Sequence, residues 1–97
     1  MAKGYWVTAY RSVSDPEKLA DYAELAGPAI TAAGGRFLAR APHAVAHEAG
    51  QDQRTVIVEF DSLDAALAAH DGEAYRAALA VLGDAVERDF RIIEGVA

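Results

Sequence analysis

The chain has 97 residues, of which 53% are hydrophobic, and a formal net charge of −6. This length suits a single domain over residues 1–97, and the apolar share is enough for one compact core, which argues against a disordered chain. The nine basic residues are dispersed, so nucleic acid is not an expected partner, and no apolar run approaches the roughly 20 residues that would span a membrane.

The first predicted element is a strand at residues 3–11, because this stretch is rich in aromatic and β-branched residues. Alternation places Trp6 and Tyr10 on one face of the strand and Tyr5 on the other. Both faces carry apolar side chains, so we expect both to be covered. Two aromatic rings that share a strand face could stack on a planar ligand, although such pairs more often form core or dimer contacts.

A long helix is predicted from about residue 16 to residue 33. Serine, aspartate and proline at positions 14–16 form a typical helix start, and the two glycines at positions 34–35 form a typical stop. Apolar residues recur at helical spacing in between, and Tyr22 is one of them. A Gly-Pro pair at positions 27–28 interrupts this repeat, and we expect a kink or a short break there because proline lacks the N–H that a helix uses.

The remaining pattern predicts a hairpin strand, its partner strand, a broken helix and a last strand, at residues 36–40, 54–60, 61–82 and 86–94. After a bend at Pro42, we expect the first hairpin strand to resume pairing at residues 44–48. Gly72 should break the second helix, since glycine is a poor residue in a helix interior. The first residues lack the pattern of a signal peptide, so we expect a cytoplasmic protein.

The order strand, helix, strand, strand, helix, strand is that of the split β-α-β, or ferredoxin-like, α+β fold. Two helices should cover one face of a four-stranded antiparallel sheet, with the first and third strands in its centre. We expect Trp6 and Ile57 on the uncovered face. Because a monomer rarely leaves such an apolar patch in water, the sequence predicts a homodimer whose two sheets pack face to face as an α/β barrel.

Short segments along nearly the whole chain have a familiar order and spacing. They are Lys3-Gly4-Tyr5-Trp6, Gly34-Gly35-Arg36-Phe37-Leu38-Ala39-Arg40, Val56-Ile57-Val58-Glu59-Phe60 with Ser62, Tyr75, and Glu94-Gly95. Together they resemble the family known as domain of unknown function 1330, within the dimeric α/β-barrel superfamily. The resemblance implies a ferredoxin-like protomer and a face-to-face dimer, but it implies no particular reaction because the family is largely uncharacterised.

The second helical region departs from the family pattern. Members tend to carry an aromatic pair followed by Ser-Pro-Glu-Tyr. Here Ala69 and His70 stand at the aromatic positions, Gly72-Glu73 replaces Ser-Pro, and Tyr75 matches. If this segment lines a pocket, the pocket should be roomier and differently polar than in other members.

A glutamate in the third strand, Glu59, is the first candidate site residue. Alternation directs Val58 and Phe60 toward the helices and Glu59 toward the dimer face. A half-buried carboxylate needs a partner, and we expect Arg40, which should lie about opposite in the hairpin. The pair has two interpretations: an ion pair that fixes the dimer geometry, or an anchor for a polar ligand or tuned acid/base group.

A second candidate site combines His70 and Tyr75 as catalytic residues with Trp6 and Tyr22 as ligand-binding residues. The superfamily resemblance implies a cavity between sheet and helices, in which a histidine and a tyrosine act on polyketides. A histidine titrates near neutral pH and can exchange a proton with an enol or a phenol. In the plainer interpretation, His70 is a partly exposed residue and Tyr75 fills the core.

No cofactor is expected, neither a metal nor a nucleotide. His43, His47 and Glu48 lie on a strand or loop without an evident further ligand, and no glycine-rich loop precedes a helix start. We therefore expect a homodimer that binds or transforms a small aromatic or polyketide-like molecule, by acid/base chemistry of the cyclase, isomerase or monooxygenase type if it is an enzyme. The alternative is a non-enzymatic binding or interaction module, in which the dimer and the Glu59–Arg40 pair are structural.

Overall fold

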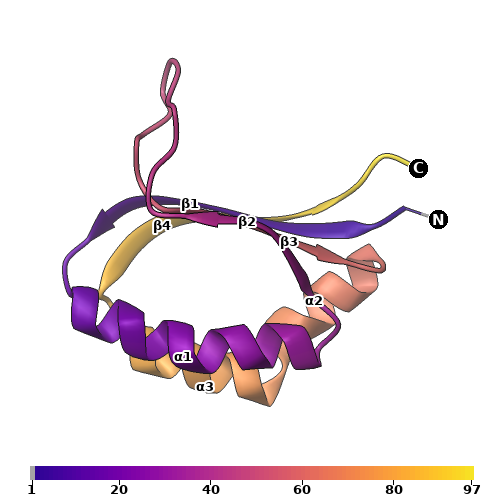
Figure 1. Cartoon of the computed structure of the whole chain (residues 1–97). Coiled ribbons are helices and arrows are strands. Elements are labelled where there is room, and N and C mark those ends of the chain that lie inside the picture. Colours follow the sequence, from indigo (N-terminus) through magenta and orange to yellow (C-terminus); the bar gives the residue numbers. More distant parts are fainter. Residues whose placement is uncertain (1) are drawn as a thin grey trace.

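The structure is a computed structural model that describes residues 2–97. Its elements, in chain order, are β1 (Gly4–Val13), α1 (Pro16–Ala32), β2 (Arg36–Ala41), β3 (Thr55–Phe60), α2 (Leu63–Asp71), α3 (Glu73–Leu82) and β4 (Val86–Glu94). The strands form one antiparallel sheet in the order β2-β3-β1-β4, and the helices lie on one face of it (Figure 1). The predicted ferredoxin-like fold, with β1 and β3 in the centre, is confirmed.

The helices begin and end largely where the sequence predicts. The Asp15 carboxylate accepts a hydrogen bond from the Lys18 N–H at the start of α1, and the Ser62 hydroxyl accepts one from Ala65 N–H at the start of α2. Gly72 separates α2 from α3. Of the two predicted alternatives at Pro28, a kink or a short break, the break does not occur, and α1 continues through the proline. Buried residues on both sides of Pro28 anchor the helix to the core. No helix in residues 2–97 has the length and apolar character to cross a membrane.

The hairpin between β2 and β3 differs from the prediction. Residues 44–48 form no strand, and Figure 1 shows the loop that follows β2 rising from the sheet on the side away from the helices. The Asp52 carboxylate holds this loop, since it accepts a hydrogen bond from Ala44 N–H at 3.0 Å and lies 3.1 Å from His43 Nδ1. Pro42 cannot donate to a ladder, and Asp52 occupies a backbone N–H that a strand would need.

The core lies between the helices and one face of the sheet. Trp6 and Tyr10 of β1 point into it and are 2% and 3% exposed, and Val58 and Phe60 of β3 are equally buried. Trp6 Nε1 donates a hydrogen bond to Ala66 O at 2.9 Å. The prediction that Trp6 faces the uncovered side was therefore wrong. Trp6 pairs with Val58 in the ladder, and directly paired residues point to the same face.

Candidate functional site

A small cavity opens between α1 and the helix-covered face of the sheet. The space open to the centre of a water molecule is about 30 Å³. At roughly 10–15 Å³ for each water, this is room for about two or three waters, or for the polar end of a small organic molecule. Aromatic and aliphatic side chains form most of the wall, and its polar part consists of Thr8, the tyrosine hydroxyls and three arginines, Arg40, Arg54 and Arg88.

Arg88 of β4 connects the tyrosines of the cavity. Its Nη1 donates to the hydroxyls of Tyr10 and Tyr22, and its Nη2 donates to the hydroxyl of Tyr75, each at 3.3 Å. The hydroxyl oxygens of Tyr22 and Tyr75 lie 2.6 Å apart. The guanidinium also stacks 5.0 Å from the ring centre of Phe90. Strands β1 and β4 and helices α1 and α3 thus bring three phenols to one cation.

The phenol of Tyr22 stays protonated at neutral pH. Burial raises its pKa well above the ordinary value of 10.0, the Tyr75 hydroxyl raises it further, and Arg88 opposes both effects. A neutral phenol beside a permanent guanidinium is a hydrogen-bond donor rather than a base. The cluster of Tyr10, Tyr22, Tyr75 and Arg88, which we call the tyrosine–arginine cluster, is therefore suited to stabilise negative charge on a bound molecule.

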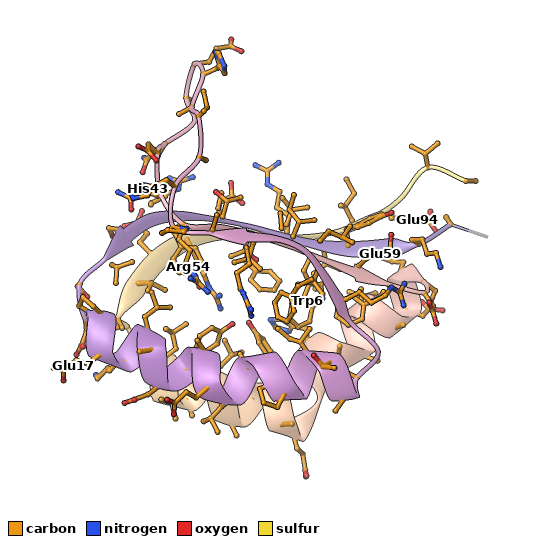
Figure 2. All side chains as sticks on the ribbon, viewed as in Figure 1. Trp6, Glu17, His43, Arg54, Glu59 and Glu94 are labelled. Carbon is orange, nitrogen blue, oxygen red and sulfur yellow. The ribbon has the colours of Figure 1, made fainter. Side chains whose placement is uncertain are left out.

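Arg54 stands directly before β3. Figure 2 shows its side chain pointing from the sheet into the space between the sheet and α1. Its guanidinium carbon lies 5.7 Å from the ring centre of Tyr10, and its Nε is buried without a hydrogen-bond partner in residues 2–97. The guanidinium of Arg40 lies 4.4 Å from the ring centre of Phe37 in the same wall. Both arginines thus present charge to the cavity from the sheet side.

His70 lies beside the cavity wall but is not one of the residues that line it. Its ring centre is 6.0 Å from that of Trp6, 5.5 Å from that of Tyr75 and 5.4 Å from that of Phe90. Its Nδ1 lies 3.3 Å from a carboxylate oxygen of Asp71, and its side chain is 37% exposed. The ring therefore reaches solvent from the outer side of the aromatic wall, and its catalytic role stays a prediction.

Glu59 lies on the opposite, uncovered face of the sheet. Arg36 donates to its carboxylate through Nε at 3.1 Å and Nη2 at 3.0 Å, and the Tyr5 hydroxyl donates at 3.1 Å. The predicted pairing with Arg40 was wrong. Arg36 stands opposite Glu59, and an irregularity in the ladder between Phe37 and Ala39 changes the register, so that Arg40 stands opposite Val56 and faces the helices.

Glu59→Gln should lower the melting temperature at pH 7 and the difference from the wild type should vanish in acid. Arg36, followed by Tyr5, holds the pKa of Glu59 below its ordinary value of 4.5. A depressed folded-state pKa contributes stability above the unfolded-state pKa, and this contribution is lost as the pH falls through the folded-state value. Thermal unfolding from pH 7 downward measures the gap, and Glu24→Gln, at an exposed position on α1, is the control. A gap that stayed constant in acid would contradict the network.

The family described as Domain of unknown function (DUF1330) matches residues 3–96. The chain belongs to this family. No curated protein matches the sequence. Among solved structures, a protein of unknown function from Rhodopseudomonas palustris is similar, with a TM-score of 0.74 and 16% identity over 99% of this chain and 84% of that one.

Two further structures share the fold of this DUF1330 protein. One is described as a proposed antibiotic biosynthesis monooxygenase from Caulobacter crescentus, with a TM-score of 0.61 and 19% identity over 99% of this chain and 91% of that one. The other is described as a dimeric ferredoxin-like protein of unknown function from Thermobifida fusca, with a TM-score of 0.55 and 16% identity over 98% and 92% of the two chains. At these identities the similarity establishes the fold alone.

The cavity of this DUF1330 protein brings together four of the six predicted site residues, namely Trp6, Tyr22, Arg40 and Tyr75. Sequence reasoning missed Arg54 and Arg88. The sequence does contain a signal for Arg88. It alternates with Phe90 and Ile92 on the helix-facing side of the last strand, where a charged residue is unexpected. No comparable signal marks Arg54, which precedes its strand.

Proposed function

We propose that this protein binds a small aromatic or polyketide-like molecule in the cavity between the sheet and α1, without a metal or nucleotide. One observation carries the proposal: an aromatic wall with Trp6 and Phe90 adjoins the hydrogen-bond donors of the tyrosine–arginine cluster. Small-molecule sites typically combine an apolar wall with a few converging polar groups. Planar rings suit the wall, and enol, phenol or carboxyl oxygens suit the cluster.

For a chemical step, we propose acid/base work on a bound enol or phenol. The hydroxyls of Tyr22 and Tyr75 and the N–H groups of Arg88 would stabilise the developing oxyanion. His70, whose ring lies beside that of Tyr75 and is partly exposed, would accept the proton that the ligand releases and pass it to solvent. Such chemistry belongs to the cyclase, isomerase and monooxygenase types, and the fold shared with a proposed monooxygenase is consistent with it.

We further propose that two copies pair through the uncovered face of the sheet. Tyr5 stands beside Ile93 on this face, and Val7 stands beside Ile57. Ile93 is 55% exposed, and a row of apolar side chains on an open sheet is a typical subunit contact. A similar structure is described as dimeric. The Glu59–Arg36–Tyr5 network on this face favours the alternative that the protein is a non-enzymatic interaction module.

Tyr75→Phe should weaken the binding of a neutral phenol, resorcinol, by about fivefold, because the variant loses one hydrogen bond to the ligand. Titration calorimetry measures the affinity. Light scattering on the same samples should give twice the mass of one chain for the wild type and for Tyr75→Phe. The matched control is Tyr5→Phe, which removes a hydroxyl from the uncovered face. Equal affinity of all three proteins, or no binding of resorcinol to the wild type, would contradict the proposed site.

A further inference from the structure

We propose that the ligand of this cavity is an anion, specifically an aromatic molecule with a carboxylate or enolate group, and that Arg54 and Arg88 are its charge partners. The inference rests on the proposed function, because it names the class of molecule that the cavity would take. It is carried by the balance of charge and of hydrogen-bond donors within the cavity.

The charges of the cavity wall are unbalanced. Arg40, Arg54 and Arg88 line it, and no aspartate or glutamate does. None of the three forms a salt bridge within residues 2–97. The chain carries 15 acidic residues and only nine basic ones, yet all the acidic residues lie outside the cavity wall. Arg54 and Arg88 are partly enclosed, whereas Arg40 is exposed. A guanidinium cannot lose its charge by deprotonation, and enclosing it favours an anion that the chain itself does not supply.

The hydrogen bonds of the cavity are unbalanced in the same direction. Arg54 Nε is buried and has no acceptor in residues 2–97. The hydroxyls of Tyr22 and Tyr75 share one hydrogen bond, which uses one of their two protons, and Arg88 can only donate to them. The hydroxyl of Tyr10 likewise receives a hydrogen bond from Arg88. The hydroxyl of Thr8, which also lines the cavity, can both donate and accept. The cavity therefore holds more donors than acceptors, and a carboxylate or enolate, which only accepts, complements it.

The shape of the cavity adds the aromatic part. The open space of about 30 Å³ suits a carboxylate in place of about two or three waters. The space between the walls, with the open mouth of the cavity included, is about 410 Å³, and the partly exposed side chains of Phe37, Val56 and Phe90 there suit a planar apolar body. An inorganic anion or acetate would match the charge but would leave this wall uncovered.

Calorimetric titration of the wild-type protein with benzoate, benzamide and acetate at neutral pH tests the inference. Benzoate and benzamide have the same ring and nearly the same size but differ in charge. We expect benzoate to bind about tenfold tighter than benzamide, and acetate to bind more weakly than benzoate. Arg54→Met, which keeps an apolar stem, should weaken the binding of benzoate about tenfold and that of benzamide by no more than about threefold, because a neutral carbonyl loses a weaker hydrogen bond than a carboxylate. The charge control, Arg91→Met at an exposed position on β4, should change neither affinity by more than about twofold.

Each other outcome has a defined meaning. Equal affinities for benzoate and benzamide would overturn the anion inference and leave the small-molecule cavity in place, whereas no binding of either would overturn both. Equal affinities for acetate and benzoate would overturn the aromatic part. If Arg54→Met and Arg91→Met lost the same benzoate affinity, the loss would follow from the change in net charge alone, and the role of Arg54 would be overturned. If Arg54→Met does not fold, Arg54→Lys replaces it, and unchanged benzoate affinity there would overturn the role of the guanidinium.

Discussion

Trp6→Ala is expected to lower the free energy of unfolding by about 3–5 kcal/mol, the range for truncation of a large buried aromatic residue. The Trp6 ring is 2% exposed, and its centre lies 5.1 Å from that of Phe60, 4.8 Å from that of Tyr75 and 5.2 Å from that of Phe90. Its Nε1 also donates to Ala66 O. The ring thus joins β1, β3, β4 and both helices of the second helical region. Small domains are stable by only about 5–15 kcal/mol, so the loss is a large share.

Urea unfolding followed by circular dichroism measures this loss, at one fixed protein concentration because any dimer makes stability concentration-dependent. Tyr5→Ala is the matched control, since Tyr5 is the neighbouring aromatic residue of β1 and its side chain lies partly exposed on the other face. We expect a loss of about 1 kcal/mol there. A loss of about 1 kcal/mol or less in Trp6→Ala would contradict the assignment of Trp6 to the covered face.

Gly4→Ala should cost about 3 kcal/mol, the upper end of the range for overpacking. A Cβ atom at position 4 would clash with the carbonyl oxygen of Ser62, and would lie 2.7 Å from Ser62 C and 2.8 Å from Leu63 Cα. All three are backbone atoms, which cannot rotate away as the end of a side chain can. Gly4 thus lets the start of α2 lie directly against β1, which brings the Ala66 carbonyl within reach of Trp6.

Gly72→Ala is the control for this prediction. The nearest atom that its Cβ would meet is Ala69 O at 3.5 Å, an ordinary contact, and its φ of −69° suits any residue. We expect a change of less than about 1 kcal/mol. Urea unfolding of both variants compares the two positions, and equal costs would show that the close approach at Gly4 does not restrict the packing of α2.

The order and type of the elements could be predicted from the sequence, because the spacing of the apolar residues and the residues typical of helix ends indicate the same element boundaries at most positions. The helix starts at Asp15 and Ser62 and the break at Gly72 are examples. The face of Trp6 could not be predicted, because both faces of β1 carry apolar side chains and alternation alone does not say which of them the helices cover. Only the packing of α2 against β1 decides it.

The partner of Glu59 was predicted incorrectly for a different reason. Its need for a cation followed from the sequence, since a carboxylate in a strand interior requires one. The identity of the cation depends on the hairpin register, which is set by the loop between the strands and also by the irregularity between Phe37 and Ala39 that puts Arg36 and Arg40 on opposite faces. The Asp52 contacts that hold this loop join residues eight and nine positions apart, and no periodic pattern marks them.

The cavity could be predicted only in part. Tyr22 and Tyr75 were recognisable as apolar residues with a polar end, and they meet there at 2.6 Å between hydroxyl oxygens. Arg88 could have been found from the parity of its strand. Arg54 becomes informative only through three-dimensional structure, since the unpartnered state of its Nε depends on burial by residues distant in sequence.

A ¹H–¹⁵N NMR titration with benzoate tests the central claim most directly, because it locates the ligand on the molecule. We predict that the largest shifts occur at the Trp6 indole N–H and the Nε–H groups of Arg54 and Arg88, with little change in the backbone amides of Tyr5 and Ile57 on the uncovered face. Shifts centred on Tyr5 and Ile57, with the Trp6 and Arg54 signals unmoved, would contradict a ligand site between the sheet and the helices.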